Sequence, residues 1–535
     1  MNMLKKTALS AMIVLIFASV CITGEVPIFP KEDQADPEGK LVVSLGGEVS
    51  VINPILSSDS ASSAVEGPIF SSLVKINEAL EFIPDLASTW EVSPDGLTWT
   101  FRLRKDVLWH DGRKFTAEDI KFTFDTILDP KVNSVRRGNY IIDGKPIRLD
   151  VADKYTVRFI LPRPYAPFLA SVSMGIIPRH ILAGKETDMG AFSHSPVGTG
   201  PFKFKEWKAG DHVELVSNDK YYLGRPRLSS IIYKMIPDSN IELMALESGQ
   251  IDTAGIPPKD YKRIMAKKGI NVFEYDSLLY IYLGLNLKSE VFKDIRVRRA
   301  LCYATDRDQL INLVFRGHAS PAYAPNAPIS WAYSDDVHKY AYDPEKADRL
   351  LDEAGWSKHI GGYRHKDGKR LEFTVLINHG NKEREKAAII LQQQYKKIGV
   401  KMNVRIMEWS ALLKIIDARK DPKDFDAVII GWSLGIDPDP YSIWHSSQYP
   451  GSLNFIGYNN PKVNRLLEEG RVTLSRSGRK RIYASMYKLI TADAPYVFLW
   501  YPKTIVGVRD RVGGLSRPGP AGLFLDIEKV FVKRR

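Results

Sequence analysis

The alternation of apolar and polar residues predicts several β-strands in the first half of the chain. Around Trp99, Phe101 and Leu103, apolar side chains alternate with polar ones, which is the period of a half-buried strand. A Ser-Pro-Asp-Gly turn at 93–96 precedes this strand, and an Asp-Gly pair at 111–112 follows it. Apolar runs predict further strands at 40–46, 157–161, 213–216 and 231–236.

The region from 372 to 431 alternates predicted strands and helices. Strands are predicted at 372–377, 400–407 and 426–431, with helices at 383–398 and 410–418 between them. In the first helix Ala387, Leu391 and Tyr395 recur every four residues, and Gly399 ends it. This order predicts parallel strands joined by crossover helices. Because ligands of such sheets bind beyond the carboxyl ends of the strands, we expect a site in the segment after Gly431.

Three short motifs predict where helices begin. Thr116 is followed three residues later by Asp119, which is the spacing of a capping box. Asp343-Pro344 and Asn460-Pro461 each place a side-chain acceptor at the cap and a proline at the first helical position. Helices are therefore expected to start at these three places.

The first 24 residues have the pattern of a secretory signal peptide. Lys5 and Lys6 precede an uncharged apolar run from Ala8 to Val20. This run is shorter than a membrane-spanning helix needs and is typical of the apolar core of a signal peptide. We therefore expect a protein exported to the periplasm or to the outer face of the cytoplasmic membrane.

Cys21 directly follows this apolar run. The sequence Ala-Ser-Val-Cys at 18–21 resembles the cleavage box of bacterial lipoproteins, in which the cysteine is lipidated. Cleavage after Thr23 or Gly24 is the alternative, and both stay open. Residues 25–39 are rich in proline and acidic residues, which predicts a flexible tether.

Composition and charge narrow the class of protein. Of the 535 residues, 44% are hydrophobic and 26% are charged, as in ordinary globular proteins, which excludes collagen-like and disordered chains. The length suggests about two to four domains. The formal net charge is +12, but the basic residues are interspersed with acidic ones, whereas a nucleic-acid-binding surface clusters them. We therefore expect no nucleic-acid partner.

The sequence contains little that points to catalysis or to a bound metal. Cys302 is the only cysteine of the body, so neither a disulfide framework nor a thiolate metal site is expected. The chain lacks the His-Glu-x-x-His, Walker A and Gly-x-Gly-x-x-Gly motifs. His110, at a predicted strand end, is interpreted as a turn residue, and the glycine-rich segment 197–202 as a hinge or tight turn. We expect no cofactor.

The densest group of candidate functional residues follows the predicted strand at 426–431. Trp432 comes directly after this strand, and Asp437 and Asp439 each precede a proline. One hypothesis makes the two acids a general acid–base pair, as in glycoside hydrolysis. However, the prolines hold both acids in extended backbone, and nothing requires their carboxylates to face each other. A rigid ligand-binding loop is therefore the favoured interpretation.

Three more residues follow this loop and are candidates for the same pocket. They are Tyr441, Trp444 and His445. Ligand clefts are rich in aromatic side chains, which favours this assignment, although packing inside the protein is the alternative for each of them.

One long stretch and six shorter motifs occur in an order that is specific to one protein family. The long stretch is LASTWEVSPDGLTWTFRLRKDVLWHDGRKFTAEDIKFTF at 86–124. The shorter motifs are VGTGPF at 197–202, GQID at 249–252, DIRVRRALCYATDR at 294–307, LLDEAGW at 350–356, the segment 431–441 and YNNP at 458–461. Together they resemble the family 5 extracellular solute-binding proteins of bacterial ABC importers, the oligopeptide- and dipeptide-binding group.

This resemblance implies an α/β fold of the type II periplasmic-binding-protein class, with three parts, two lobes and a hinge. The implied boundaries are 40–275 for lobe 1 with an inserted subdomain at about 70–195, 276–500 for lobe 2, 501–535 for a return to lobe 1, and hinge crossings near 270–280 and 495–505. A monomer would bind its ligand between the lobes, without catalysis, and deliver it to a membrane permease. Asn53, before Pro54, is the candidate pocket residue of lobe 1.

Two departures from the family pattern bear on the ligand. Peptide-binding members carry an aspartate three residues after the tryptophan of the loop, where it holds the amino terminus of the ligand. That position here is Gly435, so Asp437 or Asp439 takes the role only in a longer loop. Dipeptide-binding members carry an arginine for the ligand carboxylate where this chain has Asn378-His379-Gly380. The resemblance therefore implies an oligopeptide ligand rather than a dipeptide.

Three alternatives remain open. A neutral ligand such as an oligosaccharide would stack on Trp432 and Trp444. A secreted hydrolase would use Asp437 and Asp439 and lose turnover when either is changed to asparagine. A surface protein that binds other proteins would close around no small solute.

Overall fold

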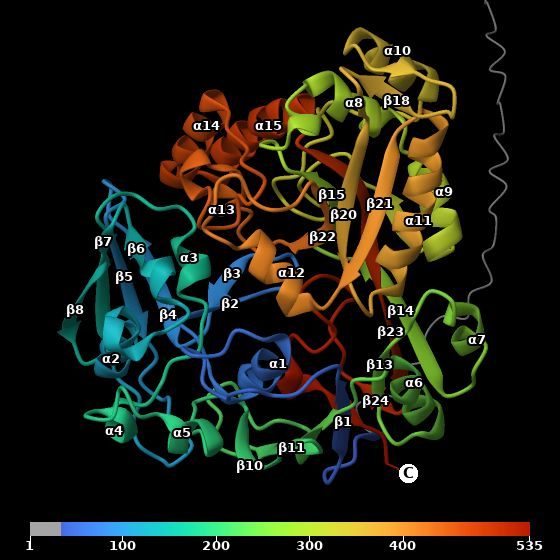
Figure 1. Cartoon of the computed structure of the whole chain (residues 1–535). Coiled ribbons are helices and arrows are strands. Elements are labelled where there is room, and N and C mark those ends of the chain that lie inside the picture. The colour runs from blue at the N-terminus through green and yellow to red at the C-terminus, as the bar shows by residue number, and fades with distance from the viewer. Residues whose placement is uncertain (1–33, 535) are drawn as a thin grey trace, which may run out of the picture.

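A twelve-stranded mixed sheet runs through the computed structural model, which describes residues 34–534 (Figure 1). Its strands follow in the order β10 (Phe202–Lys208), β11 (His212–Ser217), β12 (Ser230–Met235), β1 (Lys40–Leu45), β13 (Thr253–Gly255), β23 (Tyr496–Arg509), β15 (Leu279–Leu285), β22 (Ala427–Ser433), β20 (Glu372–Asn378) and β21 (Lys401–Met407), with β14 (Ile270–Asp276) and β16 (Ala319–Pro321) also paired to β23. The strands predicted at 40–46, 213–216 and 231–236 are thereby confirmed.

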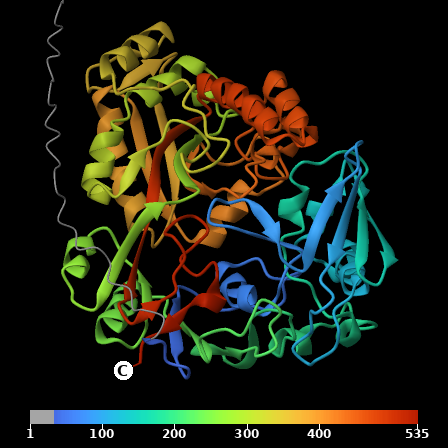
Figure 2. The ribbon, with the colours of Figure 1, turned by 180° about the vertical axis from the view of Figure 1, so that it is seen from behind.

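β23 belongs to two lobes. Its first residues pair with β15, and its last residues pair with β13 and β14. Buried apolar residues from 41 to 273 and from 508 to 532 form one large core, whereas residues from 280 to 501 form two cores on either face of the other part of the sheet. We call these parts the N-terminal and C-terminal lobes (Figures 1 and 2). The chain passes between them at 276–279 and within β23.

The parallel strands of the two lobes point toward each other. β23 runs from the C-terminal into the N-terminal lobe. β22 and β20 run the same way, since β15 is antiparallel to both β23 and β22, and β20 is parallel to β22. β1 and β13 run in the opposite direction, since β13 is antiparallel to β23 and parallel to β1. The carboxyl ends of the two sets of strands therefore face each other, and we call this region the interlobe boundary.

Helices cover both faces of the sheet in the C-terminal lobe. Ala387, Ala388 and Leu391 of α11 (Lys382–Lys397) pack on one face, together with α8 (Ile295–Tyr303) and α10 (Pro344–Glu353). The other face carries α12 (Trp409–Ile416), α13 (Tyr441–Trp444), α14 (Pro461–Val472) and α15 (Arg476–Asp493). The predicted alternation of strands and helices over 372–431 is confirmed, and β20 is parallel to both β21 and β22.

A separate four-stranded antiparallel sheet contributes its buried side chains to the N-terminal core (Figure 1). Its order is β4 (Ala87–Val92), β5 (Thr98–Leu103), β9 (Thr156–Ile160) and β8 (Arg148–Asp153), and α2 (Ala117–Leu128) packs on it. Trp99, Phe101 and Leu103 of β5 are buried, as their alternation predicts. This part contacts the C-terminal lobe, where the Ala166 amide donates to the Arg471 carbonyl oxygen at 2.7 Å.

The three predicted helix starts are present. Asp119 accepts a hydrogen bond from the Thr116 amide at 2.9 Å in front of α2, and Asp343 and Asn460 cap α10 and α14. Other elements are α1 (Ser60–Ile69), α6 (Ser239–Ser248), α7 (Tyr261–Met265), α9 (Arg307–Leu310), β2 (Val74–Ile76), β3 (Phe82–Pro84), β18 (Arg364–Lys366), β24 (Val512–Gly513) and β25 (Phe531–Val532). Among residues 34–534, no helix combines the length and the apolarity needed to cross a membrane.

The glycine-rich segment at 197–202 packs against the end of α1. The Gly200 amide donates to the Ile69 carbonyl oxygen at 2.8 Å. A Cβ atom at Gly198 would lie 1.9 Å from the same oxygen, which is too close for any side chain. These glycines are therefore explained by the close packing of two backbones. The sequence predicted a hinge or tight turn here and did not predict this packing.

His110 is held neutral against this segment. Its Nδ1 accepts from the Gly198 amide at 3.1 Å, and its Nε2 donates to the Gly200 carbonyl oxygen at 3.0 Å. Burial lowers the pKa of His110 from 6.5 to about 4. The unfolded chain takes up this proton at a higher pH than the folded chain. The folded state therefore loses stability as the pH falls from 6.5 toward 4.

We expect His110→Gln to cost less stability at low pH than at neutral pH. At about pH 4.5 the substitution removes a group that opposes folding by about 2–3 kcal/mol, an effect that is absent at about pH 7. Urea titrations of both proteins at the two pH values measure the difference. His359→Gln, at an exposed histidine, is the control. An equal cost of His110→Gln at both pH values would contradict this account.

Candidate functional site

Three strand ends of the C-terminal lobe place aromatic and polar side chains at the interlobe boundary. Trp432 lies near the end of β22, Asn378 ends β20, and Trp409 follows β21 as the first residue of α12. Trp432 and Asn378 project from the sheet face that carries α12, as do Leu376 and Ile430 two residues before them. Trp409 is 42% exposed. These residues form the C-terminal wall of the candidate site.

Stacked tyrosines fix the position of the Trp432 ring. The ring stacks on Tyr282, with centroids 6.4 Å and planes 20° apart, and Tyr282 stacks on Tyr496 at 3.8 Å. The indole Nε1 donates to the Tyr496 hydroxyl at 3.5 Å. Both tyrosines are buried, whereas Trp432 is only half-buried. Trp432 therefore offers a rigid, partly open aromatic surface at the boundary.

The two acidic residues of the loop after β22 are each paired with an arginine. Arg479 of α15 donates to the two Asp437 oxygens at 2.5 and 2.6 Å, and these side chains are 5% and 9% exposed. Arg471 of α14 donates from Nε to Asp439 at 2.8 Å. Burial raises the pKa of Asp439, although Arg471 favours its charged form. Each carboxylate is bound by its own arginine, so the two are not arranged as an acid–base pair around a substrate.

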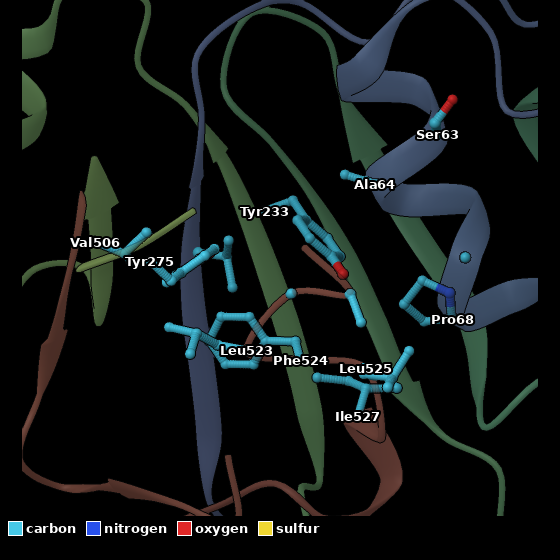
Figure 3. A pocket seen from close by; sticks show the side chains of 14 residues that line it. Ser63, Ala64, Pro68, Tyr233, Tyr275, Val506, Leu523, Phe524, Leu525 and Ile527 are labelled. Atoms are coloured by element: carbon cyan, nitrogen blue, oxygen red, sulfur yellow. The ribbon is translucent and has the colours of Figure 1, made fainter. Parts of the chain in front are cut away.

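The N-terminal lobe contributes a largely apolar cavity of about 500 Å³ beside the strands that cross between the lobes (Figure 3). Tyr275 of β14 and Val506 of β23 line it on the crossing side, and Tyr233 of β12 lines it from below α1. Figure 3 shows the side chains of Leu523 and Phe524 directed into the same space. The cavity suits apolar groups, and its position next to the crossing makes it the N-terminal part of the candidate site.

Among the described residues, one group of side chains has the spacing of a metal site. Ligand atoms of Glu206, His212 and Glu214 lie within 4.8 Å of one another on the hairpin of β10 and β11. Glu214 is already paired with Lys205 at 2.8 Å, and His212 Nδ1 lies 2.9 Å from Asp211. These ion pairs occupy the group, and its hairpin is at the edge of the sheet rather than at the interlobe boundary.

Comparison with known families agrees with this arrangement of facing strand ends. Residues 81–454, more than half of the chain, match the family model described as bacterial extracellular solute-binding proteins, family 5. The chain belongs to this family. The α/β fold predicted from the sequence, with two lobes of the type II periplasmic-binding-protein class, is thereby confirmed.

Relatives of this family 5 protein have been solved with different ligands. Oligopeptide-binding protein AppA of Bacillus subtilis is 36% identical over 98% of both chains. Its structure with a nonapeptide has a TM-score of 0.80 and covers 93% of this chain and 99% of that one. NikZ from Campylobacter jejuni with Ni(L-His) is 31% identical, with a TM-score of 0.82 and coverage of 93% and 100%. DppA from Helicobacter pylori with the peptide STSA is 28% identical, with a TM-score of 0.77 and coverage of 93% and 98%.

Three predicted site residues of this family 5 protein pack beside α14. The Tyr441 ring lies under the Arg471 guanidinium, 3.7 Å from its carbon, and stacks on the His445 ring at 4.2 Å. Trp444 is fully buried in the core of α13, α14 and α15. Their ligand contacts stay predictions, and Trp444 has no exposed surface in this structure.

Asn53 lies in the loop after β1, whose carboxyl end faces the interlobe boundary. The side chain itself is fully buried. Its backbone amide donates to Glu66 at 2.8 Å, and its Nδ2 donates to Met189 Sδ at 3.3 Å. Asn53 thus fastens this loop to α1, and its contact with a ligand stays a prediction.

The loop after β22 also contains the spacing Gly-x-Ser-x-Gly, which sequence analysis overlooked. Gly431 to Gly435 has the letters of a hydrolase nucleophile elbow. An elbow places the serine on a sharp strand-to-helix turn, whereas Ser433 ends β22 opposite Leu279 and α13 begins only at Tyr441. Within residues 34–534, no histidine hydrogen-bonds to Ser433. The serine therefore lacks the base that a nucleophile needs.

Sequence reasoning could have identified Trp409 as a residue of the site, but it could not have identified Arg471 and Arg479. Trp409 follows the strand at 400–407 just as Trp432 follows the strand at 426–431, so the same rule identifies it. Arg471 and Arg479 lie 32 and 42 residues from the aspartates that they bind, and no local pattern links them.

Proposed function

We propose that this chain is the extracytoplasmic substrate-binding component of an ABC importer and that it binds oligopeptides between its two lobes. AppA, an oligopeptide-binding protein, matches it over almost its full length, and DppA of Helicobacter pylori is an ABC transporter-associated binding protein with a bound peptide. The facing strand ends of the two lobes are where α/β folds bind ligands.

One observation carries the preference for oligopeptides over dipeptides. Counted without gaps from Trp432, the resemblance to the family implies that Gly435, which has no side chain, occupies the position of the aspartate that holds the ligand's amino terminus in other members. Asp437 and Asp439, the nearest replacements, are neutralised by Arg479 and Arg471. The loop therefore has no free carboxylate for an ammonium group. In a peptide that is too short to be held through its backbone and side chains, the ion pair between its ammonium group and a carboxylate is the main anchor. Such a peptide loses this anchor here.

The proposed movement is closure of the lobes about the chain crossings. We assign residues 40–275 and 501–535 to one lobe, with an inserted subdomain at about 70–195, and residues 276–500 to the other. We place the hinge at the chain crossings near 270–280 and 495–505, where β14 and β15 both pair with β23. Closure about such a hinge buries the ligand and presents the closed face to the permease.

Export and anchoring belong to the same proposal. The signal peptide at 1–24 and Cys21 lie outside the described residues. Most of the tether at 25–39 also lies outside them. We propose that the chain acts as a monomer in the periplasm, or on a lipid anchor at Cys21, and that it binds no nucleic acid.

The chain is proposed to have no enzymatic activity. The family consists of substrate-binding proteins, which favours this proposal. The two loop aspartates serve as ion-pair partners, and Ser433 has no adjacent base among the described residues. A hydrolase would need at least one of these groups free to act.

Thermal unfolding of refolded, ligand-stripped protein with a ligand panel tests this function. The panel holds dipeptides, tri- to nonapeptides, α- and β-linked oligosaccharides, nickel chelates and haem. A ligand at about 100 times its Kd adds about 2.7 kcal/mol to the folded state, which raises Tm by a few degrees. We expect peptides of three or more residues to raise Tm. Stabilisation by sugars alone would show that the ligand class is wrong.

A further inference from the structure

The two lobes touch on the side of the interlobe boundary that lies opposite the chain crossings. The Ala166 amide of the N-terminal lobe donates to the Arg471 carbonyl oxygen of α14 at 2.7 Å. The Arg471 guanidinium lies over the Tyr165 ring, with its carbon 5.5 Å from the ring centroid. Figures 1 and 2 show α14 and the four-stranded sheet on one side of the molecule, with β14 and β23 on the other. We call these two contacts with Arg471 the closing contact.

Arg471 is held in place by its own lobe. Its Nε donates to Asp439 at 2.8 Å, and its guanidinium carbon lies 3.7 Å from the centroid of the Tyr441 ring. Both partners belong to the C-terminal lobe, so neither is lost when the lobes separate. Arg471 therefore presents a fixed cationic surface to the N-terminal lobe.

The N-terminal lobe presents Tyr165 and Ala166 from a proline-rich segment. Pro162, Pro164 and Pro167 surround these two residues. Each proline fixes its own φ and restricts the residue before it to extended backbone, so the segment has little conformational freedom. The Tyr165 side chain also packs against the N-terminal core. Little entropy is lost when such a rigid segment forms a contact.

Both parts of the closing contact gain from the meeting of the lobes. The Arg471 carbonyl lies in the last turn of α14, where carbonyl oxygens lack a partner within the helix, and the Ala166 amide supplies one. The Tyr165 ring adds a cation–π attraction, which strengthens as water is excluded. Burial, together with the nearby Asp439 carboxylate, raises the pKa of Tyr165 to about 12, so the phenol stays neutral beside this carboxylate.

Other contacts between the lobes are less suited to control closure. The pair of Arg476 with Glu81, at 3.7 Å, is about half exposed and therefore weak. On the crossing side, His318 Nδ1 lies 3.0 Å from Glu274 Oε2. Rotation about a hinge separates groups in proportion to their distance from it, so this second pair moves little. The closing contact lies on the far side and is separated early in any opening.

We propose that Tyr165 is a positioning residue for peptide binding, which holds the lobes closed through Arg471 and so slows the release of every bound peptide. This inference rests on the proposed function. The closing contact contains no side chain of the C-terminal wall, so its effect is independent of the peptide sequence. A group that stabilises only the closed state shifts the equilibrium between open and closed forms by one factor for all ligands.

Stopped-flow measurement of peptide release from Tyr165→Leu tests this role. The tightest-binding peptide of the ligand panel is compared with two others of different sequence. We expect the off-rate to rise about 3- to 10-fold, by the same factor for each peptide, because one cation–π contact is lost. The association rates should stay unchanged.

Two further variants separate the closing contact from a general loss of structure. Tyr165→Phe keeps the aromatic ring and should release peptides at the wild-type rate. Tyr155→Leu removes another half-buried tyrosine of the N-terminal lobe, whose ring contacts Lys154, and should also behave as wild type. An equal rise of the off-rate in Tyr155→Leu would assign Tyr165 a merely structural role and overturn the inference.

Small-angle X-ray scattering of the ligand-free proteins gives a readout that needs no peptide. We expect a larger radius of gyration for Tyr165→Leu than for wild type and Tyr165→Phe. Unchanged scattering together with unchanged off-rates would overturn the inference. Off-rates that rise by a different factor for each peptide would make Tyr165 a ligand contact and overturn it too. If wild type binds no peptide, the proposed function fails, and the scattering alone decides whether the closing contact holds the lobes.

Discussion

Asp437→Asn is expected to lower the free energy of unfolding of the C-terminal lobe by about 3–5 kcal/mol. The substitution leaves the Arg479 guanidinium, whose side chain is 5% exposed, without its carboxylate partner. Arg479 also donates to the Tyr483 hydroxyl at 2.8 Å, so its position is held from two sides and it cannot turn to water without disturbing α15. Urea unfolding followed by far-UV circular dichroism measures the loss.

Two asparagine variants calibrate this result. Asp439→Asn breaks a pair in which Arg471 is 22% exposed, so we expect a smaller loss of stability. Asp336→Asn breaks the exposed pair with Lys488 and should change stability by about 0.5 kcal/mol or less. A cost of Asp437→Asn no larger than that of Asp336→Asn would show that the buried pair does not hold the loop.

Trp432→Ala is expected to weaken peptide binding by about 30- to 1000-fold while the protein stays folded. Trp432 is half-buried at the end of β22, and its ring is fixed by the stack on Tyr282. Such rigid aromatic surfaces at the centre of a binding site carry a large share of the binding energy, because little side-chain entropy is lost when a ligand covers them. Calorimetric titration with the best peptide of the panel measures the effect.

The control for this prediction is Trp207→Ala. Trp207 is also half-buried, but it lies on β10 at the edge of the N-terminal lobe, where it stacks on His194. Its loss is expected to leave peptide affinity unchanged. If Trp432→Ala and Trp207→Ala bind peptide equally well, Trp432 is not part of the ligand wall.

Local sequence patterns predict the elements near the site with good accuracy. The strand ends at 377 and 431 were predicted within two residues of the ends of β20 and β22. This success follows from strong periodicity, since buried parallel strands and an amphipathic helix leave clear apolar patterns. The rule that ligands bind at strand carboxyl ends then places Trp432 correctly at the interlobe boundary.

The sequence did not predict which side chains bind to each other. In the sequence, Asp437 and Asp439 stand out only as acidic residues that precede prolines. The local sequence is the same whether such a carboxylate is free or bound to a distant arginine. Trp444 shows the same limit, because an aromatic residue after a loop packs into a core as readily as it lines a pocket.

Calorimetric titration of ligand-stripped protein with a series of peptides from two to nine residues tests the central claim most directly. We predict saturable binding for peptides of three or more residues, with little or none for dipeptides and for oligosaccharides. This pattern follows from a site between facing strand ends in which both loop carboxylates are already bound to arginines. Tight binding of dipeptides, or of oligosaccharides alone, would contradict it.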